Sequence, residues 1–489
     1  MSRVKCSQNP SEIEPILAEL KGLPTPSWAD ITDSYKLTHY SLYPETATFM
    51  QSHFESRGGR FPEIVHFGLQ YFIIKYFLDQ PVTYDNMAYM IETCDRHFDR
   101  PHIFNRDAFK IIIEEYDGHP PVRIRALPEG MVVPQRVPLS IVESIDDRLI
   151  ALVNYIETLL VQVWYPTTVA SQSRHQKRQI LDRLKTSGTP ETIFFKLHDF
   201  GCRGVTCPEQ AALGGAAHLV NFMGTDTVPA LRLLHRYYSE RMAGFSIVAT
   251  EHSVMALRGK EGELDQVRQV LDQYPTGLVA IVGDTYDIYD FCTQLGTRFK
   301  DRILGRDGTL VIRPDSGDPH EVLIEVLRIL EAQFGATINE KGYKVLPPQV
   351  RLIQGDGIDV NTLDPILGTL EKHGWSADNL AFGSGGGLLM KMNRDTNEFA
   401  FKANASVVDG RPIDVYKDPV TAPGKRSKRG PLKVIRSPEG RVITLTGQAA
   451  VEDTHPDLMQ VVYDAGELKV FDTLKRIRTR AALAEDEPA

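Results

Sequence analysis

The chain has 489 residues, 42% of them hydrophobic and 24% charged, and its net charge is −9 at pH 7. This length exceeds what one ordinary hydrophobic core supports, so we expect two or three domains of a globular protein. A negative balance gives no reason to expect nucleic acid as a partner.

Composition also bears on the cellular compartment. No run of about 18 apolar residues stands out, so we expect no membrane span. Residues 1–23 mix acidic and apolar side chains and lack the basic-then-apolar layout of a signal peptide. The five cysteines are scattered, and Cys202 and Cys207 have no second pair or histidine cluster that would indicate zinc. These features predict a cytoplasmic protein.

The first part of the chain predicts an α+β arrangement. Residues 1–27 are expected to be a lead-in with a short helix, which Pro24 and Pro26 end. The segment after it, Asp30–Tyr40, is dense in polar and aromatic side chains. Alternation and helical spacing then predict a strand at 47–56, helices at 68–78 and 106–116, short strands within 122–142, and helices at 147–164 and 171–184.

From about residue 190 the pattern changes to apolar strand, polar turn and amphipathic helix, repeated seven times. The predicted strands are 192–197, 220–223, 245–249, 277–282, 309–312, 350–353 and 380–382. Charged or glycine residues follow each of them, and in parallel sheets this carboxyl edge is where ligands bind. Both a barrel and an open parallel sheet fit the pattern, and we favour the barrel.

The residues after these strands allow two interpretations. Asp and Ser at such positions are often helix caps with no further role. Capping does not account for Arg203, His252 or Arg313, because these side chains do not cap helix N-termini. We therefore interpret the strand ends together as a binding edge, in which any single member could still be structural.

The last strand runs into a glycine-rich turn, Ser384–Gly387, followed by the first turn of a helix. Glycine lets backbone N–H groups approach an anion closely, and a helix N-terminus favours negative charge. The turn is a candidate phosphate cradle. Tight packing between a strand and a helix is the alternative.

After Arg394 the alternation of strands and helices stops. Residues 397–415 and 431–475 alternate as strands. Between them a loop, Lys417–Gly430, carries a basic run from Lys425 to Arg429. This run fits a solvated surface, a nucleic-acid or import patch, or a loop over an anionic substrate.

The charged residues of the predicted binding edge have both signs. Arginines bind phosphate in a bidentate manner, whereas carboxylates bind ribose hydroxyls, a metal ion or a developing cation. A phosphorylated sugar offers phosphate oxygens to the arginines and hydroxyl groups to the carboxylates. The sequence holds no Walker motif and no dinucleotide-binding glycine fingerprint. The side chains are Arg203, Arg313, Arg394, Asp226, Asp284, Asp315 and Asp356. Residue chemistry alone therefore predicts an α/β enzyme that handles a phosphosugar.

Nine short segments, in order over nearly the whole chain, resemble nicotinamide phosphoribosyltransferases. They are TDSYKLTHY (32–40), KLHDFGCRG (196–204), NFMGTDTV (221–228), EHS (251–253), GDTYDIY (283–289), IRPDSG (312–317), IQGDG (353–357), AFGSGGGLL (381–389) and KDP (417–419). The resemblance implies an α/β fold of the type II phosphoribosyltransferases, working as a head-to-tail homodimer with two shared active sites. The implied domains are an irregular β/α barrel at 189–395 and a mixed α+β sheet domain made of 28–188 and 396–489, after the lead-in at 1–27.

The implied reaction joins nicotinamide to 5-phosphoribosyl pyrophosphate and yields nicotinamide mononucleotide and pyrophosphate, with Mg²⁺ on the substrate phosphates. ATP is implied as a coupled co-substrate that phosphorylates His252. Phe200 would stack on the nicotinamide ring, with the partner subunit's Tyr35 on its other face. Asp226 would accept a hydrogen bond from the carboxamide and would repel nicotinate by its like charge.

The resemblance assigns the remaining positions to the sugar and the phosphates. Arg313 would hold ribose-phosphate and pyrophosphate groups, and Arg203 and His252 would face pyrophosphate. The positions along the ribose, its phosphate and the reaction centre are Asp284, Pro314, Asp315, Gly355, Asp356, Gly385, Gly386 and the partner subunit's Arg394. Further cations that could bind phosphate or ATP are Arg57, Lys402, Lys417 and Lys425.

One position departs from the family: Cys202 stands where its members carry tyrosine, which bears on pyrophosphate or ATP handling. Two alternatives stay open. The nearer is a nicotinate phosphoribosyltransferase, a related fold with a different acceptor, against which Asp226 argues. The more distant is a non-catalytic binding or signalling protein of the same fold, against which the joint presence of Arg313, Asp315 and His252 argues.

Overall fold

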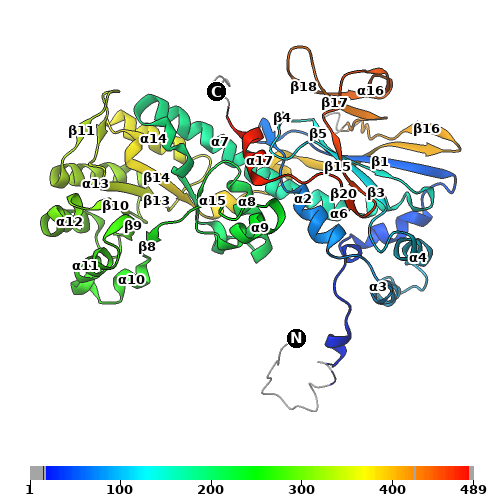
Figure 1. The fold of residues 1–489 in the computed structure, drawn as a ribbon, viewed down its shortest axis with the longest axis horizontal. Helices are drawn as coiled ribbons and strands as arrows, with labels where there is room; N and C mark the ends of the chain where they lie inside the picture. The colour runs from blue at the N-terminus through cyan, green and yellow to red at the C-terminus, as the bar shows by residue number, and fades with distance from the viewer. Residues whose placement is uncertain (1–14, 16–17, 422–425, 484–489) are drawn as a thin grey trace.

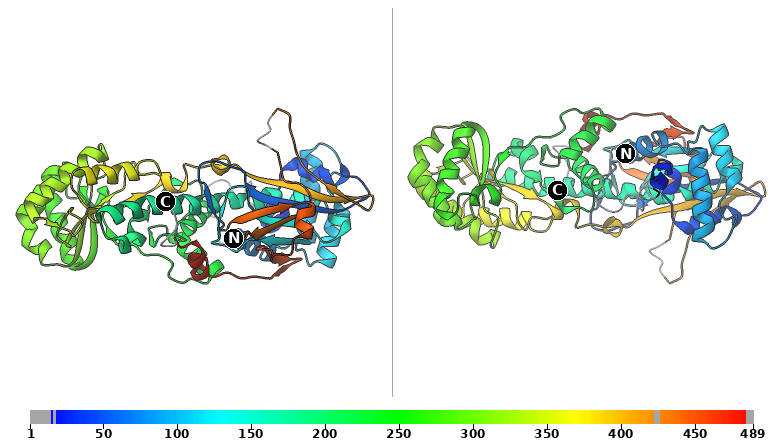
Figure 2. Two further views of the ribbon diagram at one scale, coloured as in Figure 1. Left: turned by 90° about the horizontal axis from the view of Figure 1, so that it is seen from above. Right: turned by 90° about the horizontal axis from the view of Figure 1, so that it is seen from below.

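The computed structural model describes residues 15, 18–421 and 426–483. Lead-in residues 1–14, 16 and 17, and the predicted phosphate-binding residue Lys425, therefore lie outside the described residues. The described chain forms two lobes at opposite ends of an elongated molecule (Figures 1 and 2). One lobe is built on an antiparallel sheet, and the other on a parallel sheet surrounded by helices.

The antiparallel sheet joins the beginning of the chain to its end. Its strands lie in the order β16 (Arg411–Asp414), β15 (Phe399–Val408), β1 (Ala47–Ser56), β5 (Pro138–Ser144), β3 (Val122–Ala126), β19 (Gln460–Asp464) and β20 (Glu467–Leu468). The first predicted strand, β1, has the expected bounds and pairs along its length with β15, which follows the barrel in sequence. The buried rings of Phe54 and Phe399 stack between them at 5.1 Å. Distant parts of the chain therefore share one core.

Helices and short strands cover this sheet. They are η1 (Trp28–Asp30), η2 (Ser34–Ser41), β2 (Glu63–Val65), α2 (Leu69–Phe72), η3 (Ile73–Leu78), α3 (Tyr84–His97), α4 (Arg106–Glu115), β4 (Val132–Pro134), η4 (Asp147–Leu149), α5 (Leu152–Tyr155), α6 (Glu157–Leu160), η5 (Val161–Val163), β17 (Leu432–Arg436), β18 (Val442–Thr446), α16 (Gln448–Glu452) and α17 (Leu474–Ala481). The helix expected at 68–78 is one α-helical turn that continues as a π-helix. The strands predicted within 431–475 are present as β17, β18, β19 and β20. The helix α16 also lies in this stretch, and α17 begins at its end, where Thr473 accepts a hydrogen bond from the Arg476 N–H.

The second lobe is the irregular β/α barrel that the sequence predicts. Its strands are all parallel and lie in the order β7 (Gly224–Thr225), β6 (Leu197–Asp199), β14 (Leu380–Ser384), β13 (Val350–Gln354), β10 (Asp307–Arg313), β9 (Thr276–Val282) and β8 (Val248–Ala249). One parallel bridge, from Gly224 to Phe245, connects the β7 edge to the segment that leads into β8. The sheet therefore curves round on itself with a weak seam, which makes the barrel irregular.

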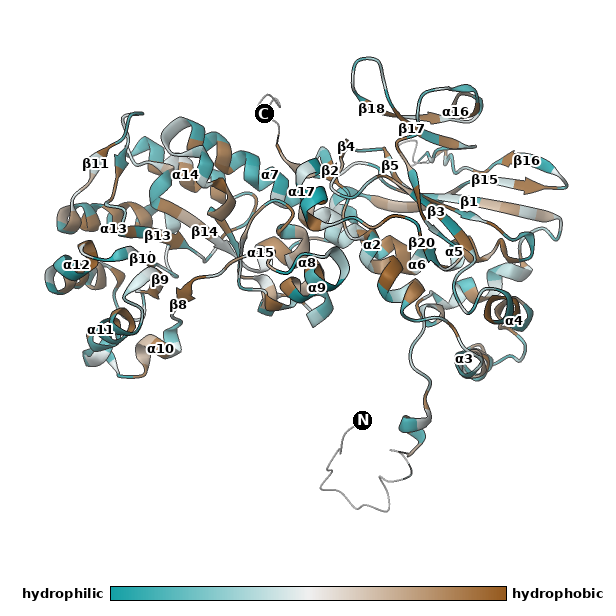
Figure 3. Ribbon diagram, in the orientation of Figure 1, coloured by the Kyte–Doolittle hydropathy of each residue, from teal (hydrophilic) through white to brown (hydrophobic). Residues whose placement is uncertain are grey.

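Amphipathic helices surround the barrel strands (Figure 3). The elements of this lobe outside its sheet are η6 (Pro190–Phe195), η7 (Gly201–Gly204), α8 (Pro208–His218), α9 (Val228–Tyr238), α10 (His252–Ala256), η8 (Lys260–Gly262), α11 (Glu263–Gln273), α12 (Ile288–Leu304), α13 (Pro319–Phe334), β11 (Thr337–Ile338), β12 (Lys344–Val345), α14 (Leu363–Lys372), η9 (Ala377–Asn379) and α15 (Gly386–Leu389). The short helix η10 (Arg394–Asn397) follows them in sequence and packs on the sheet lobe, where the Arg60 N–H donates to the Thr396 carbonyl. Leu310, Ile281 and Leu352 on neighbouring strands are fully buried beneath them. Burial on both faces explains why these strands are continuous apolar runs.

Three predicted strands are corrected by the structure. Of the strand predicted at 245–249, only Val248–Ala249 forms the strand β8. Residues 190–195 form a 3₁₀ helix that begins at Pro190, and the strand starts only at Leu197. Residues 220–223 form a turn before β7, where Phe222 is fully buried. An apolar run indicates burial, and here a turn achieves that burial without extended backbone.

The long helix α7 (Trp164–Ser187) runs between the two lobes (Figure 2). Arg174 on it pairs with Glu63 of β2, and Arg183 pairs with Asp364 of α14, so the helix is tied to both lobes. By length and mean hydropathy the helical stretch 147–187 could cross a membrane, although the sequence contains no long uninterrupted apolar run there. However, 61% of its most apolar window is buried in the fold, as expected of a core helix.

Candidate active site

Parallel strands all end at the same edge of a sheet, and this edge of the barrel gathers most of the predicted site residues. Phe200 follows β6, Asp226 follows β7, and Asp284 follows β9. Backbone hydrogen bonds between neighbouring strand ends hold the edge in register. The Phe200 N–H donates to the Ser384 carbonyl at 3.0 Å, and the Asp226 N–H donates to the Asp199 carbonyl at 2.9 Å.

Phe200 lies against glycine backbone on two sides. A Cβ atom at Gly383 would lie 1.9 Å from Cε2 of Phe200, and one at Gly355 would lie 3.4 Å from the same atom. The Gly355 position is also 3.5 Å from Oδ1 of Asp315. Glycine at these positions therefore makes room for the aromatic ring directly beside a carboxylate.

Asp226 is held by two side chains on the same edge. Its Oδ1 is 2.8 Å from Nε2 of His198 and accepts a hydrogen bond from the Ser246 hydroxyl at 2.5 Å. Burial alone would raise the pKa of Asp226, but His198, Ser246 and the charge of Arg313 outweigh it and lower this pKa. Asp226 is therefore an ionised acceptor, and its side chain is 45% exposed.

A second group of charges lies around His252. Its Nε2 is 2.9 Å from Oδ1 of Asp284, and the Arg313 guanidinium is 3.5 Å from Oδ2 of Asp315. Burial raises the pKa of Asp315, and the nearby negative charges of Asp284 and Asp356 raise it further, against the lowering effect of Arg313 and His252. Three carboxylates, an arginine and a histidine thus share one electrostatic environment.

The structure separates caps from site residues. The N-cap of α12 is Asp287, which accepts from the N–H groups of Tyr289 and Asp290, so Asp284 is not needed for capping. The N-cap of α13 is Asp318, which accepts from the His320 N–H, so Asp315 is likewise not needed for capping. The capping interpretation therefore holds for the second acid of each pair but not for the first.

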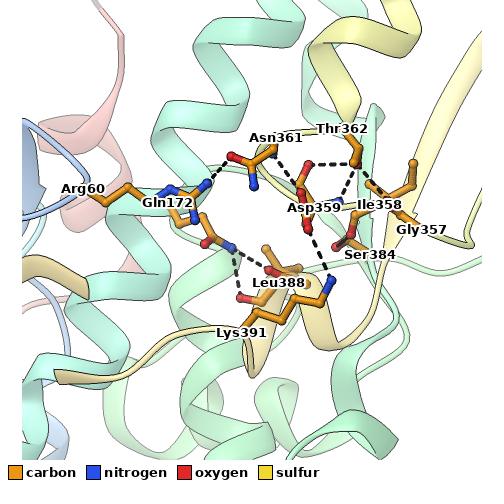
Figure 4. A network of polar contacts seen from close by, with 11 residues as sticks. Arg60, Gln172, Gly357, Ile358, Asp359, Asn361, Thr362, Ser384, Leu388 and Lys391 are labelled. Atoms are coloured by element: carbon orange, nitrogen blue, oxygen red, sulfur yellow. Dashed lines mark hydrogen bonds and ion pairs between the residues drawn. The ribbon is translucent and has the colours of Figure 1, made fainter. Parts of the chain in front are cut away.

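Contacts from neighbouring segments support the glycine turn at Gly385–Gly387, and Figure 4 shows those of the flanking residues Ser384 and Leu388. The Ser384 hydroxyl donates to the Ile358 carbonyl, and a Cβ at Gly387 would lie 2.4 Å from that same oxygen. A Cβ at Gly386 would meet open space, so the turn leaves this position accessible. The helix after the turn, α15, is a single turn, so the helix-dipole part of the prediction contributes little and the cradle depends on backbone N–H groups.

Arg203 and Pro314 also lie on this edge. Arg203 is exposed on η7, and a Cβ at the adjacent Gly204 would lie 3.2 Å from the Gly386 nitrogen. Pro314 is buried between Arg313 and Asp315. The structure thus brings together one group of predicted residues, which we call the barrel-edge group: Phe200, Arg203, Asp226, His252, Asp284, Arg313, Pro314, Asp315, Gly355, Asp356, Gly385 and Gly386.

The other predicted residues lie on the sheet lobe. Burial lowers the pKa of Lys402, and the charges of Arg57, Arg394 and Lys36 lower it further, so these cations are close together. Lys36 neighbours Tyr35, which is 59% exposed on η2. We call this set the basic group, after its cations; its members are Arg57, Arg394, Lys402 and the adjacent aromatic residue Tyr35. Lys417, whose backbone pairs with Ser427, is exposed on a loop of the same lobe.

Some polar residues of the edge had no signal in the sequence. Ser246 lies in an irregular segment before β8, and Asp359 and Lys391 bind each other at 3.2 Å beside the glycine turn (Figure 4). Arg60 of the sheet lobe contacts Asn361 of the barrel lobe in the same network. Only the spatial proximity of distant segments identifies them.

The chain matches two family models. Residues 195–467 match the nicotinate phosphoribosyltransferase (NAPRTase) family, and residues 28–124 match the N-terminal domain of nicotinamide phosphoribosyltransferase. A nicotinamide phosphoribosyltransferase of Xanthomonas campestris pv. campestris is 44% identical over 461 residues, which cover 93% of this chain and 97% of the relative. One of Acinetobacter baylyi is 34% identical, with coverage of 92% and 96%.

Solved structures share the fold at low sequence identity. A nicotinate-nucleotide pyrophosphorylase of Pyrococcus furiosus has a TM-score of 0.57 at 15% identity, over 98% of this chain and 97% of that protein. Human nicotinic acid phosphoribosyltransferase has a TM-score of 0.55 at 16% identity, with coverage of 92% and 93%. These likenesses confirm the fold expected from the sequence.

Proposed function

The chain belongs to the nicotinate phosphoribosyltransferase family and is a pentosyltransferase, and on this premise we propose that it transfers the phosphoribosyl group of 5-phosphoribosyl pyrophosphate to nicotinamide. The observation that carries the proposal is an aromatic face, Phe200, on the same edge as an ionised acceptor, Asp226. Nicotinamide offers a flat ring and an NH₂ donor to match them. The names of the relatives support the same acceptor substrate.

The chemistry needs no protein nucleophile. The ring nitrogen of nicotinamide supplies the electron pair for the new bond to C1 of the ribose, and the pair of the broken C1–O bond leaves with pyrophosphate. Charge develops on the ribose as in glycoside cleavage, and carboxylates close by stabilise it. Asp315 and Asp356 are the side chains we assign to this role, with Arg313 and Arg203 on the phosphates.

Mg²⁺ fits the site as a companion of the substrate. Among the described residues no three His, Cys, Asp or Glu side chains form a ready-made metal cage. Mg²⁺ in phosphoryl sites is commonly held by one or two carboxylates and the substrate phosphates. The neighbouring Asp284, Asp315 and Asp356 can supply those carboxylates. The ion would offset negative charge on departing pyrophosphate.

We propose His252 as the residue through which ATP is coupled. Its hydrogen bond to Asp284 engages Nε2 and orients the ring, which leaves Nδ1 to attack the γ-phosphorus of ATP. The P–O bond to ADP breaks as the N–P bond forms, and water later releases phosphate. His252 is 47% exposed, as attack on a diffusible nucleotide requires. Arg57, Lys402, Lys417 and Lys425 are the candidate cations for the ATP phosphates.

We further propose a head-to-tail homodimer in which the basic group of one subunit completes the barrel-edge group of the other. Both residues expected from the partner, Tyr35 and Arg394, belong to the basic group. The barrel strand β8, which Figure 3 colours as hydrophobic, supports this assembly. Both of its residues are exposed, and Leu278 on the neighbouring strand β9 is 53% exposed. An exposed apolar strand is a surface that a partner covers.

A cytoplasmic location is part of the proposal. The cysteines in the described part of the chain, Cys94, Cys202, Cys207 and Cys292, are all free thiols. Free thiols are typical of reducing compartments.

The test is a paired assay with purified protein, 5-phosphoribosyl pyrophosphate and Mg²⁺, offered nicotinamide or nicotinate, each with and without ATP. Mononucleotide from nicotinamide alone, increased by ATP, is the expected result. Turnover of nicotinate instead would show that the acceptor substrate is nicotinate, and it would contradict the role assigned to Asp226. Turnover of neither substrate would overturn the proposed function.

A further inference from the structure

The two oxygens of the Asp226 carboxylate are not equivalent. Oδ1 is the atom next to both the Ser246 hydroxyl, at 2.5 Å, and Nε2 of His198, at 2.8 Å. Oδ2 accepts no hydrogen bond from any residue in the described part of the chain. One oxygen is therefore committed to the protein and the other remains an open acceptor.

The three side chains come from separate segments of the barrel edge. His198 lies in β6, Asp226 follows β7, and Ser246 precedes β8. Close backbone packing fixes the imidazole, because a Cβ at Gly224 would lie 2.7 Å from its Nδ1. The ring is also 5.2 Å from that of Phe200 and is only 12% exposed. His198 is thus a rigid support, whereas Ser246 is an exposed side chain that can be replaced without opening the core.

We infer that Ser246, together with His198, is a specificity-determining pair that acts through Asp226 by holding its carboxylate in one rotamer with a single oxygen directed to the acceptor substrate. This inference rests on the proposed function. The pair selects a carboxamide, which donates a hydrogen from its NH₂ group to the open oxygen. A carboxylate substrate has no hydrogen to donate and would bring a second negative charge to an acceptor that cannot turn away.

The hydroxyl of Ser246 has no comparable alternative role. Its other hydrogen bond, to the carbonyl of the adjacent Ile247, is 3.4 Å long and therefore weak. The bond to Asp226 is charge-assisted and short, and such bonds contribute more than neutral ones. Removing the hydroxyl leaves Asp226 with one support and frees it to rotate. The loss should therefore affect substrate choice more than folding.

The experiment compares Ser246→Ala, Ser246→Thr and the wild type in the paired nicotinamide and nicotinate assay. Thr297→Ala, which removes an exposed hydroxyl from the outer helix α12, is the matched control. In Ser246→Ala we expect KM for nicotinamide to rise roughly tenfold, the effect of losing a hydrogen bond to a charged group, with a smaller change in kcat. The ratio of kcat/KM for nicotinamide to kcat/KM for nicotinate should fall. Ser246→Thr keeps the hydroxyl group and should therefore keep both KM for nicotinamide and this ratio close to their wild-type values.

The outcomes distinguish a failure of the inference about Ser246 from a failure of the proposed function. An active wild type and an unchanged selectivity ratio in Ser246→Ala would overturn the inference while the proposed function stands. A loss of kcat for both substrates without a change in their ratio would indicate a merely structural role and would also overturn it. A wild type that does not use nicotinamide would overturn the proposed function itself.

Discussion

Nε2 of His252 lies 2.9 Å from Oδ1 of Asp284, although the two residues follow different barrel strands. The aspartate is 7% exposed and the histidine 47% exposed, so a buried carboxylate orients an accessible imidazole.

Asp284→Asn should lower phosphorylation of His252 by at least tenfold, because the amide does not stabilise a charged imidazole as a carboxylate does. The measurement is the transfer of label from γ-labelled ATP to the protein, followed by mononucleotide synthesis with and without ATP. Asp287→Asn is the matched control, since Asp287 only caps α12. Equal labelling of the two variants would contradict the assignment.

Gly383→Ala should weaken nicotinamide binding. The new methyl group would lie 1.9 Å from Cε2 of Phe200, so the ring must move. We expect KM for nicotinamide to rise roughly tenfold to a hundredfold, since misplacing a positioning group by about 1 Å has effects of this size. Gly386→Ala places its methyl group in open space and should change KM for 5-phosphoribosyl pyrophosphate instead. Steady-state kinetics with each substrate varied will check both, and an unchanged nicotinamide KM in Gly383→Ala would count against Phe200 as the stacking residue.

The proposed sharing of active sites between subunits predicts that two inactive variants can complement each other. Tyr35→Ala and Asp226→Ala should each be nearly inactive alone, but a co-expressed mixture forms heterodimers in which one site is intact. Random association places about a quarter of all sites in that state, so about a quarter of wild-type activity should return. The control is a mixture of Phe200→Ala and Asp226→Ala, both in the barrel-edge group, which should not recover activity. If mixed dimers form and activity stays absent in the first mixture, the sites are not shared.

Glu129 predicts a pH dependence of stability. Burial raises the pKa of this carboxyl from 4.5 to about 7, only partly offset by the N–H of Gln70. Between these values the folded state keeps a proton that the unfolded state releases. This group therefore makes the free energy of unfolding fall as the pH rises through that window, by about 1.4 kcal/mol per unit.

Glu129→Gln should remove this slope, so the difference in urea midpoint between variant and wild type should grow from pH 5 to pH 8. Its sign follows from the raised pKa: the wild type loses stability on the alkaline side and the neutral amide does not. Parallel midpoint curves across this range would show that Glu129 is not protonated in the fold.

The sequence by itself determined most of the parallel strands and the polar turns that follow them. Strands at 277–282, 309–312, 350–353 and 380–382 were predictable to within two residues at each end, because strands buried on both faces are continuous apolar runs. The turn residues after them were equally visible, since charged side chains interrupt those runs. Arg313, Asp315 and the glycine turn could therefore be placed at strand ends from the sequence, whereas their expected roles came from the family resemblance.

The tertiary structure alone decided which of those residues face the site. Asp284 and Asp287 are chemically identical, yet one binds His252 and the other caps a helix, because side-chain direction depends on local backbone geometry. Ser246 had no sequence signal, since its importance lies in contact with Asp226, 20 positions away. The separation of the barrel-edge group from the basic group is likewise a property of the folded lobes. Hydrophobic periodicity reports burial along one segment, whereas a site depends on which segments the fold brings together.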